Sequence, residues 1–478
     1  QVKNHKVMRG LPFENEDINE CWIADRDRFS YEALNGEERL QRPMLKQGGQ
    51  WIEVDWQTAL EYVVNGLQCL KKEKGANSIG ALVSPHSTLE ELYLAGALVR
   101  GLGSNNIDYR LRNAEFAAAP GVRWLGRSIA SLSTLQSVLV VGSNLRKDHP
   151  LFAQRIRQAA RKGCVVMSVN AVVWDWAMPV AQTLVSAPGA WTQALADVAA
   201  AVAQEKGVQA PVASGQASNE AARAIAVALL AGEQKAVLLG NAAAHHAQAS
   251  SLLALAQWIA EQTGASVGYL TEAANTVGAQ WVQAVPGQGG LNAAEMLAGG
   301  LKGVILLNTE PVFDSAAGVK AAEALAQAEM VVTLSPFKTN LEFSDVLLPI
   351  APFTETSGSF VNAEGRLQSF HAVVRPLGET RPAWKVLRVL ANLLDLQGFD
   401  FETSQDVLSK ATGAPAGQAQ SVPAELLDNR TTVVPQAAAS GAADPVVASI
   451  YQLDGLVRRS TSLQLTADAR LAREGAAA

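Results

Sequence analysis

The sequence predicts an α/β protein built from doubly wound parallel sheets in more than one domain. Short apolar runs without polar alternation, such as residues 79–84, 138–142 and 165–169, alternate with helical patterns. Strands that are apolar on both faces and alternate with helices are typical of parallel sheets covered on both sides. The 478 residues also exceed the roughly 250–300 residues at which a single hydrophobic core stops growing.

The elements can be justified in order along the chain. Residues 1–48 indicate a small β-rich segment with polar turns. Asp55 is a suitable N-cap for an amphipathic helix, because apolar residues follow it at helical spacing through position 70. Three strands, each followed by a helix, are then predicted. The strand at 79–84 precedes a helix at 89–102, the strand at 138–142 precedes one at 151–161, and the strand at 237–240 precedes one at 252–262. Further strands are predicted at 165–169, 304–307, 331–334 and 346–350.

The pattern decays after about residue 402. Residues 411–447 are rich in Ala, Gly, Pro, Gln and Ser, and such a stretch gains too little from burial to offset its ordering entropy. We expect it to extend over other surfaces or to order only against a partner. Because the chain starts without Met inside an expected strand, we also expect a fragment of something longer.

Composition excludes several classes of function. The net charge of −6 argues against a nucleic-acid partner, since nucleic-acid-binding domains usually carry a basic patch. No run approaches the ~20 apolar residues of a membrane span, so direct membrane insertion is not expected. The three cysteines, Cys21, Cys69 and Cys164, form no C-x-x-C pair and are typical of a reducing compartment.

A strand–turn–helix unit carries the first candidate binding residues. After the strand at 137–141 come Gly142, Asn144 and His149, followed by a helical stretch. A glycine at this place permits a tight turn, and the start of the next helix favours an anion. A phosphate or nucleotide site fits this pattern. An ordinary βα turn with a structural asparagine fits it too, because a lone glycine turn is a weak signal.

A polar loop after another apolar strand carries the second set. The strand ends at Pro349, and the glycine-punctuated loop after it contains Glu355, Asn362, Glu364 and Arg366. Such a loop can hold a polar ligand. Alternatively, its charged groups can satisfy one another in a hydrogen-bond network between domains.

A polar stretch that ends at Ala114 is the most informative part of the chain. It contains Asn105, Asn106 and Asp108, then Arg112, and resembles a motif of molybdopterin-dependent oxidoreductases. The two sets above resemble further motifs of that superfamily. Its members place a Cys or selenocysteine on molybdenum at the last position, where a methyl group cannot coordinate a metal. The resemblance therefore implies the superfamily's fold, with two interleaved α/β domains, and a pocket that has lost its metal ligand.

The N-terminal residues narrow the resemblance. Residues 16–31 are similar to a segment of the large iron–sulfur subunits (G or 75-kDa type) of respiratory complex I, NADH:quinone oxidoreductase, and residues 457–464 are similar to the C-terminus of the bacterial form. Ala24 falls where some relatives place the fourth cysteine of a cluster, and four thiolates normally hold such a cluster. The resemblance implies that this chain corresponds to the vestigial molybdopterin-oxidoreductase portion of the subunit, without the cluster-bearing N-terminal part.

This resemblance implies a non-catalytic scaffold inside a proton-translocating, electron-relaying enzyme. The expected clusters, [2Fe–2S] and [4Fe–4S], would lie in the full-length subunit, with no cofactor, metal or catalytic residue in this stretch. The expected partners are other peripheral-arm subunits, including the flavoprotein subunit. The expected location of the chain is the cytoplasmic side of the bacterial inner membrane, to which it would be attached peripherally through the other subunits of the complex. The isolated chain is predicted to be inactive.

The resemblance also assigns residues to a vestigial pterin pocket: Asn105, Asn106, Asp108, Gly142, Asn144, His149, Glu355, Asn362, Glu364 and Arg366. We expect the loops around Asn106, Asn144 and Asn362 to converge at the carboxyl ends of parallel strands. With Ala114 in place of the metal ligand, we favour a self-satisfied network. In it Glu355, Glu364 and Arg366 would pair, because unpaired buried charges cost several kcal/mol.

Other interpretations stay open at this point. A true molybdopterin oxidoreductase, of the formate dehydrogenase or nitrate reductase type, could bind metal through Glu115 or Asp108 instead. A free-standing nucleotide- or thiamine-binding α/β protein would require the motif agreements to be coincidence. His245 and His246 invite a metal hypothesis, but adjacent histidines after a turn are more often loop or cap residues.

The order of the predicted strands also indicates how the domains interleave. Residues 1–48 would be the remnant of a [4Fe–4S] segment. Residues 49–134 and 330–400 would form a central domain with one sheet, residues 135–329 an inserted α/β domain, and residues 401–478 a tail.

Overall fold

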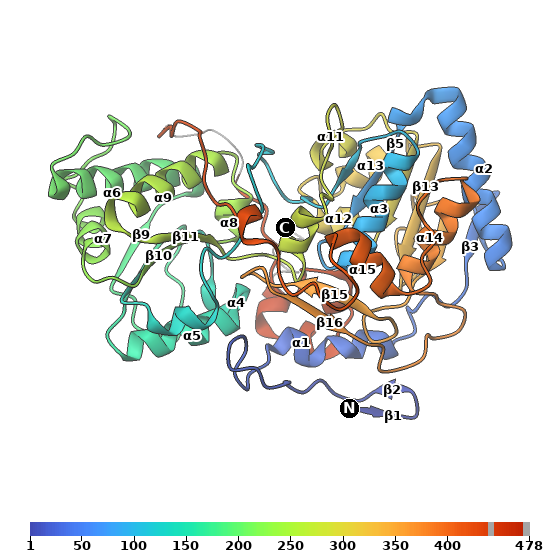
Figure 1. Ribbon diagram of the computed structural model, residues 1–478, viewed down its shortest axis with the longest axis horizontal. Coiled ribbons are helices and arrows are strands. Elements are labelled where there is room, and N and C mark those ends of the chain that lie inside the picture. The colour runs from blue at the N-terminus through green and yellow to red at the C-terminus, as the bar shows by residue number, and fades with distance from the viewer. Residues whose placement is uncertain (438–443, 472–478) are drawn as a thin grey trace.

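The computed structural model describes residues 1–437 and 444–471 and places two sheets in two lobes (Figure 1). The seven-stranded sheet lies in the right-hand lobe of that view, and the five-stranded sheet lies in the left-hand lobe. The expected α/β class with parallel sheets is confirmed. Among the described residues, no helix combines the length and apolar character needed to cross a membrane.

The seven-stranded sheet is parallel except at one edge. A β3–β4 hairpin adds two antiparallel strands beside β14. The order across the sheet is β4 (Gln50–Glu53), β3 (Met44–Gln47), β14 (Val346–Pro349), β13 (Met330–Ser335), β12 (Gly303–Leu307), β5 (Ile79–Val83) and β6 (Ile107–Asp108). The chain runs outward from β5 to β6 and later from β12 to β14. The strand order therefore reverses between β5 and β12.

Alternate residues of these strands enter cores on opposite faces. Ile305 and Leu307 of β12 join one core, and Val304 and Leu306 join the other. The first core includes residues of α2 (Trp56–Lys74), α3 (Leu89–Gly101), α10 (Thr276–Trp281), α14 (Ala383–Leu393) and α15 (Ser404–Thr412). The second includes α11 (Ala293–Leu297) and α13 (Lys320–Leu325), and α12 (Pro311–Asp314) precedes α13.

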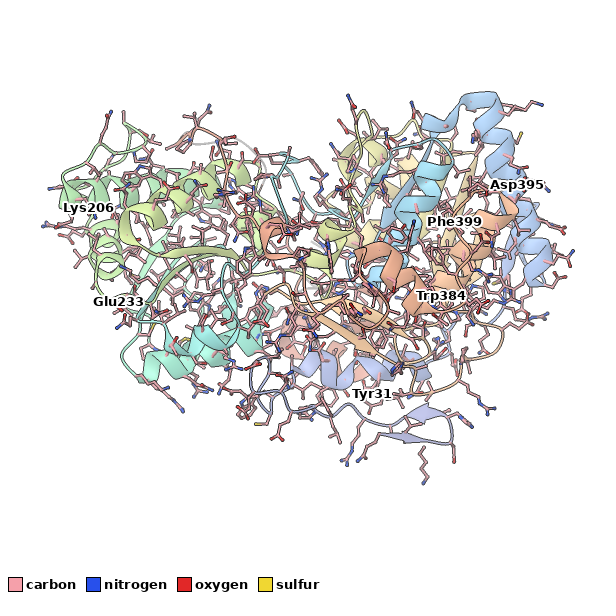
Figure 2. The ribbon with its side chains drawn as sticks, viewed as in Figure 1. Tyr31, Lys206, Glu233, Trp384, Asp395 and Phe399 are labelled. Carbon is pink, nitrogen blue, oxygen red and sulfur yellow. The ribbon has the colours of Figure 1, made fainter. Side chains whose placement is uncertain are left out.

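The sequence located the start of α2 on the first face. The Asp55 side chain accepts a hydrogen bond from the Thr58 N–H at 2.8 Å, so α2 begins at the predicted cap. Trp384 of α14 and Phe399 are both buried on the α14 side of the sheet (Figure 2).

The five-stranded sheet is wholly parallel. Its order is β11 (Ser266–Tyr269), β10 (Lys235–Leu239), β7 (Ser137–Val141), β8 (Val165–Asn170) and β9 (Gln182–Val185). One face packs against α6 (Trp191–Lys206), α7 (Glu220–Leu230) and α9 (Ala249–Thr263), and the other packs against α5 (Pro150–Arg161) and the 3₁₀ helix η3 (Ala130–Thr134). Here the strand order reverses between β7 and β10, which are followed by the short helices α4 (Leu145–Asp148) and α8 (Asn241–Ala244).

The remaining elements are short. The N-terminal part contains β1 (Val2–Lys3), β2 (Lys6–Val7), α1 (Asp25–Phe29) and η1 (Ser30–Asn35), all at the bottom of Figure 1. Two further 3₁₀ turns are η2 (Ala76–Ser78) and η4 (Pro188–Ala190). A separate hairpin, β15 (Gly358–Val361) with β16 (Leu367–Phe370), follows β14. The C-terminal part contains η5 (Ala424–Leu426), α16 (Gly455–Arg458) and α17 (Thr461–Gln464).

Strand pairing corrects one expected boundary. Strands β5 and β13 share a sheet, as expected for residues 79–84 and 331–334. However, β12 lies within residues 135–329, and it pairs with β5 and β13 rather than with the five-stranded sheet. Strand β12 is apolar on both faces and lies between β5 and β13, so it belongs to the sheet of the larger lobe. The division of the chain into domains otherwise stays a prediction.

Residues 411–437 of the Ala- and Pro-rich stretch contact the β15–β16 hairpin and the smaller lobe. The Leu367 N–H of the hairpin donates to the carbonyl oxygen of Gln420. The Asn429 side chain donates to the carbonyl oxygens of Trp124 and Val267, and the Thr431 N–H donates to Gln257 of α9. This agrees with the expected extension over other surfaces. Residues 438–443 of that stretch lie outside the described residues.

Candidate functional site

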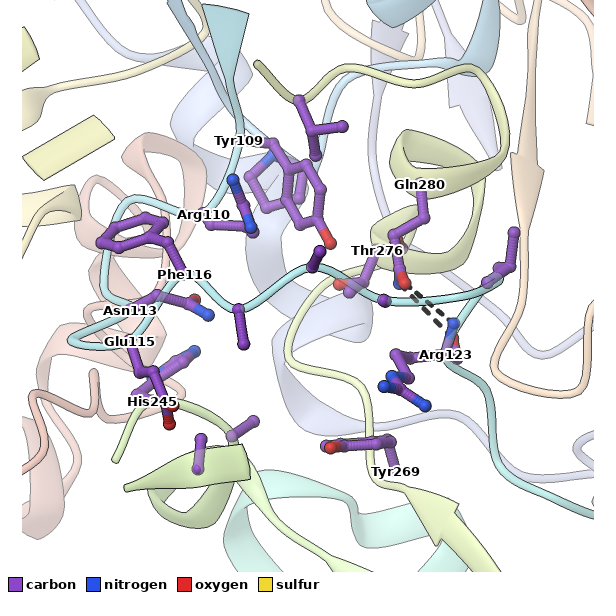
Figure 3. A pocket seen from close by; sticks show the side chains of 18 of the residues that line it. Tyr109, Arg110, Asn113, Glu115, Phe116, Arg123, His245, Tyr269, Thr276 and Gln280 are labelled. Carbon is purple, nitrogen blue, oxygen red and sulfur yellow. Dashed lines mark hydrogen bonds between the residues drawn. The ribbon is translucent and has the colours of Figure 1, made fainter. Parts of the chain in front are cut away.

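A cavity of about 840 Å³ lies between the two lobes (Figure 3). The polypeptide between β6 and Val122 forms one wall, and residues 269–272 after β11 form another. None of the ten residues assigned to the vestigial pocket is among the residues that line this cavity. Other polar and charged residues line it instead, among them Tyr109 and Arg110, which directly follow Asp108, and Asn113, Glu115, Asn241 and Glu272.

The charged side chains in the cavity wall already have partners in the chain. Arg110 forms two hydrogen bonds to the carboxylate of Asp108, at 2.9 and 3.0 Å, and its guanidinium stacks on Phe116. Glu115 accepts hydrogen bonds from the backbone N–H and the hydroxyl of Ser250, at the start of α9. The remaining three, Arg123, Glu272 and Glu295, are likewise hydrogen-bonded. These contacts leave no free acid, base or nucleophile among these five side chains.

A buried ion-pair cluster lies beside the cavity. Arg112 binds Glu272 at 2.8 Å, and the His245 ring lies 3.5 Å from the same carboxylate. Burial acts to raise the pKa of Glu272, but Arg112 and His245 hold it well below its ordinary value. The other face of Arg112 reaches Asp314 at 3.5 Å. The cluster therefore ties the loop before Ala114 to the segment after β11 and to α12.

Ala114 itself contributes only its backbone to this region. Its N–H donates to the carbonyl oxygen of His245 at 3.2 Å, while its flanking residues Asn113 and Glu115 line the cavity. The position that carries the metal ligand in the resembled superfamily is thus beside the cavity, and it presents a methyl group. A methyl group supplies no donor, so the residues here do not fit that metal.

Asn105 and Asn106 lie away from this region, because they precede β6 rather than follow a strand. The Asn106 amide donates to the carbonyl oxygens of Asn77 and Ile79, at the amino end of β5. The expectation that Asn106 would converge with the other loops at the carboxyl ends is therefore wrong. Asp108, at the end of β6, holds Arg110 and accepts from the backbone of Ala293.

Gly142 and Asn144 form the tight turn after β7, at the carboxyl edge of the smaller sheet. Gly142 has φ +65°, and a Cβ there would lie 2.8 Å from the backbone nitrogen of Ala243. The backbone N–H of Asn144 donates to Asp148, whose pKa is raised by burial to about 6. Close contact between the β7 and β10 turns therefore requires this glycine, whatever the site binds.

His149 is buried between α4 and α5, shortly after that turn. Its Nε2 lies 2.9 Å from the carbonyl oxygen of Thr271, and its ring stacks on Phe152. Burial lowers the pKa of His149 to about 4, which keeps the ring neutral near pH 7. Its Nδ1 and the Oδ1 of Asn144 have no partner among the described groups.

The loop after β14 forms contacts that differ from those expected. Glu355 does not pair with Arg366. It is buried against Arg39, which donates two hydrogen bonds to its carboxylate at 2.8 and 2.9 Å. No sequence signal pointed to Arg39, because it lies 316 residues away in a segment without a clear pattern.

The second half of that loop agrees better with the expected network. Glu364 and Arg366 pair at 2.9 Å, and Asn362 accepts hydrogen bonds from the backbone N–H groups of both. Glu364 also accepts from the backbone of Ile129, at the start of the smaller lobe. The Arg366 side chain is 41% exposed, so this pair is not a buried charge network.

Metal-binding residues are scattered in the described part of the chain. No group of three or more His, Cys, Asp or Glu side chains there is arranged to hold a metal ion. The two adjacent histidines bind carbonyl oxygens, His245 that of Val446 and His246 that of Pro188. Cys21 and Cys69 are exposed and Cys164 is buried. One cysteine within residues 1–32 cannot supply the four thiolates that a cluster needs.

The fold and these motifs define the class of protein. Residues 39–393 match the molybdopterin oxidoreductase family, and the chain belongs to it. Residues 1–32 match the NADH-ubiquinone oxidoreductase NDSU1/NuoG-like, 4Fe-4S domain. The predicted resemblance to the large iron–sulfur component of complex I is confirmed.

Individual relatives carry two kinds of name. The chain is 28% identical to the G-type component of the NADH-quinone oxidoreductase of Streptomyces coelicolor, over 82% of this chain and 51% of that protein. It is 24% identical to the probable oxidoreductase YjgC of Bacillus subtilis, over 86% of this chain and 49% of that protein. The chain thus spans about half the length of these curated relatives.

A solved structure shows the same fold. The acetylene hydratase of Pelobacter acetylenicus matches with a TM-score of 0.55 and 14% sequence identity, over 82% of this chain and 67% of that one. At this identity the likeness concerns the fold alone.

Proposed function

We propose that this chain is the structural, non-catalytic portion of a complex I subunit. Iron–sulfur clusters outside the chain would relay electrons from NADH to quinone, and the chain would hold that region in place. The observation that carries the proposal is a family scaffold with alanine at both expected ligand positions, 24 and 114. Neither methyl group can bind a metal or a cluster.

The contacts around Ala114 support a structural role. Charged groups near it serve to join parts of the chain: Glu115 caps α9, and Arg112 ties Glu272 to Asp314. A catalytic site would need at least one acid, base or ligand free to meet a substrate. In line with this, the chain itself is proposed to hold no cofactor and to show no turnover alone.

The proposed setting is supported by the relative named as a component of an NADH-quinone oxidoreductase, and its details are part of the proposal. Partners would be the other peripheral-arm subunits of a proton-translocating NADH:quinone oxidoreductase, including its flavoprotein subunit. The chain would lie on the cytoplasmic side of the bacterial inner membrane, attached through the complex. Its ten assigned pocket residues would be remnants of a pterin site.

A metal-binding molybdopterin oxidoreductase is the second candidate, favoured by the relative named as a probable oxidoreductase. Metal would have to bind through Glu115 or Asp108. Both carboxylates are occupied, Glu115 by Ser250 and Asp108 by Arg110. Binding would break contacts that position α9 and the loop after β6.

Metal analysis of the purified chain and turnover of the assembled enzyme together test the proposal. We expect no stoichiometric molybdenum or tungsten, either in the natural chain or after Ala114→Cys. In the assembled complex, Ala114→Cys should leave NADH–quinone turnover unchanged. Stoichiometric metal in the natural chain, or loss of turnover in a folded, assembled Ala114→Cys complex, would overturn the proposal.

A further inference from the structure

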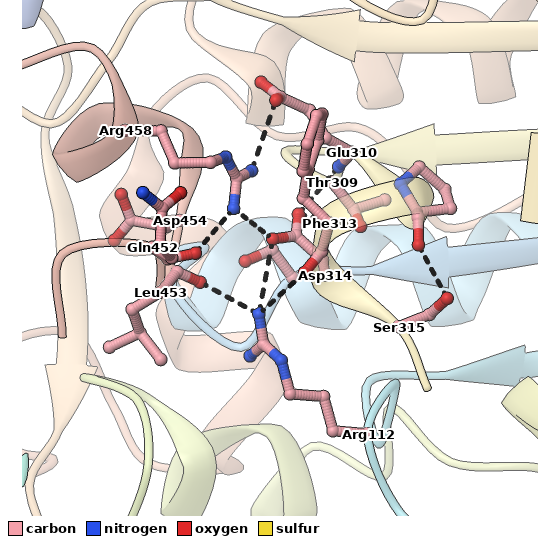
Figure 4. A network of polar contacts seen from close by, with 12 residues as sticks. Arg112, Thr309, Glu310, Phe313, Asp314, Ser315, Gln452, Leu453, Asp454 and Arg458 are labelled. Carbon is pink, nitrogen blue, oxygen red and sulfur yellow. Dashed lines mark hydrogen bonds and ion pairs between the residues drawn. The ribbon is translucent and has the colours of Figure 1, made fainter. Parts of the chain in front are cut away.

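Residues 444–471 are here named the arginine segment, and its residues 454–459 lie at the carboxyl edge of the seven-stranded sheet, where Arg458 meets Glu310 and Asp314 (Figure 4). In open α/β sheets this edge, at the point where strand order reverses, is the usual place for a ligand. That point lies between β5 and β12. A small cavity there is lined by Ser84, Asn308 and Ser335, the residues at the ends of β5, β12 and β13, and also by residues 454–456 of the arginine segment.

The space left under the segment is small. The cavity holds about 90 Å³, which is on the scale of a few water molecules. The arginine segment therefore takes up the room that a larger polar molecule would need at this edge.

The edge is acidic, and the segment supplies matching cations. Glu310 and Asp314, both 5% exposed, follow β12. Arg458 lies 2.8 Å from Asp314 and 3.2 Å from Glu310, and its guanidinium stacks over Phe313. Burial disfavours its charge, yet the two carboxylates hold the pKa of Arg458 above its ordinary value.

A second arginine repeats the arrangement. Arg459 binds Glu310 at 2.6 Å and Glu38 at 2.7 Å, and it stacks over Phe337. Each arginine thus meets two carboxylates and an aromatic ring, a combination that favours the planar guanidinium over other cations. A phosphate-bearing ligand would meet carboxylates at this edge and be repelled.

Further contacts hold the segment to three other parts of the chain. Asp454 caps α16 and lies 3.7 Å from His86, which follows β5. Ser460 and Ser462 donate to Glu32 of the N-terminal part. Asp468 pairs with Lys147 of the smaller lobe. The apolar side is packed as well, by a core of Ile450, Tyr451, Leu453, Val457, Leu463 and Ala469.

We propose that this edge is a recognition site whose ligand is the chain's own Arg458–Arg459 segment, which binds there in place of a polar cofactor and fastens the lobes to the N-terminal part. The proposal deepens the structural role proposed above. It is tested by binding within this chain alone, so its outcome is independent of electron transfer.

The experiment cuts the chain and asks whether the segment stays. A protease recognition sequence placed within residues 438–443 allows the folded chain to be cleaved before the arginine segment. After cleavage we expect the fragment that contains the arginine segment to stay bound to the rest of the chain, here named the body. The two pieces should then co-elute in gel filtration at micromolar concentration. A fragment that separates from the folded body under these conditions would overturn the proposal.

Variants of the fragment test which side chains are recognised. Synthetic peptides of residues 444–471 compete with the fragment for the cleaved body, so the body's folding is unchanged in every comparison. Replacing both Arg458 and Arg459 by Ala should weaken competition about a hundredfold or more, because the double substitution leaves the buried Glu310 without a cation and Asp314 with Arg112 alone.

The matched control is Arg470→Ala in the same peptide. Arg470 is exposed, so its loss should change competition by no more than about twofold. Equal competition by the double-Ala peptide and the natural peptide would show that the edge does not recognise the arginines, and it would overturn the proposal.

Discussion

The buried ion pair between Arg39 and Glu355 offers the sharpest test of the structure. Arg39 is 1% exposed and Glu355 is 5% exposed. Two parallel hydrogen bonds join them, and Glu355 also accepts from the Leu377 N–H at 3.0 Å. Replacing Arg39 by Met keeps much of the side-chain volume but leaves a buried carboxylate without its cation. Breaking such a pair costs about 3–5 kcal/mol.

An exposed pair of equal length provides the control. Arg42 binds Glu379 at the same distance of 2.8 Å, but the two side chains are 47% and 43% exposed. Arg42→Met should therefore cost at most about 1 kcal/mol, because water screens this pair. The two substitutions differ in burial and in the number of hydrogen bonds lost, because Arg39 also donates to the carbonyl oxygens of Leu34 and Pro336.

Hydrogen exchange of the amides in β13 and β14 measures the loss of stability in the larger lobe separately from the stability of the smaller lobe. The Arg39→Met/Glu355→Met double variant should recover part of the loss, since no unpaired charge remains. Recovery stays incomplete because the Leu377 N–H loses its acceptor. Losses of similar size for Arg39→Met and Arg42→Met would refute the reasoning.

Three further predictions concern single positions. Burial raises the pKa of Glu90 and of Glu91 to about 7. The folded state therefore binds these two protons more tightly than the unfolded chain does. The free energy of unfolding should fall as pH rises from about 4.5 to 7. Glu91→Gln should flatten that slope in unfolding measurements across this range, and an unchanged slope would count against the assignment. Gly142→Ala should destabilise the smaller lobe by roughly 2 kcal/mol or more, measured by exchange in β7, because the new methyl group meets the backbone of Ala243. Arg366→Ala should cost no more than about 1 kcal/mol in the same assay, since the Arg366 side chain is 41% exposed and Glu364 keeps its hydrogen bond from the Ile129 N–H. A loss of several kcal/mol would indicate a buried network after all.

Local patterns determined much of the architecture. Apolar runs of β5, β7, β8, β10, β12, β13 and β14 are buried along nearly their whole length, so they are readable as strands of covered parallel sheets. The cap at Asp55 and the periodicity after it located α2, because both signals lie within one short stretch. The loss of a ligand at Ala114 is likewise a property of one position and its neighbours.

Pairings between distant residues were decided only by the tertiary structure. Strand β12 joins the seven-stranded sheet because it pairs with β5 on one side and β13 on the other. No local sequence signal indicates that these two strands are its neighbours. The partner of Glu355 is Arg39, and the partners of Arg458 are Glu310 and Asp314, each more than 140 residues away. Such contacts form between residues that only the fold brings together, whereas sequence patterns report what neighbouring residues share.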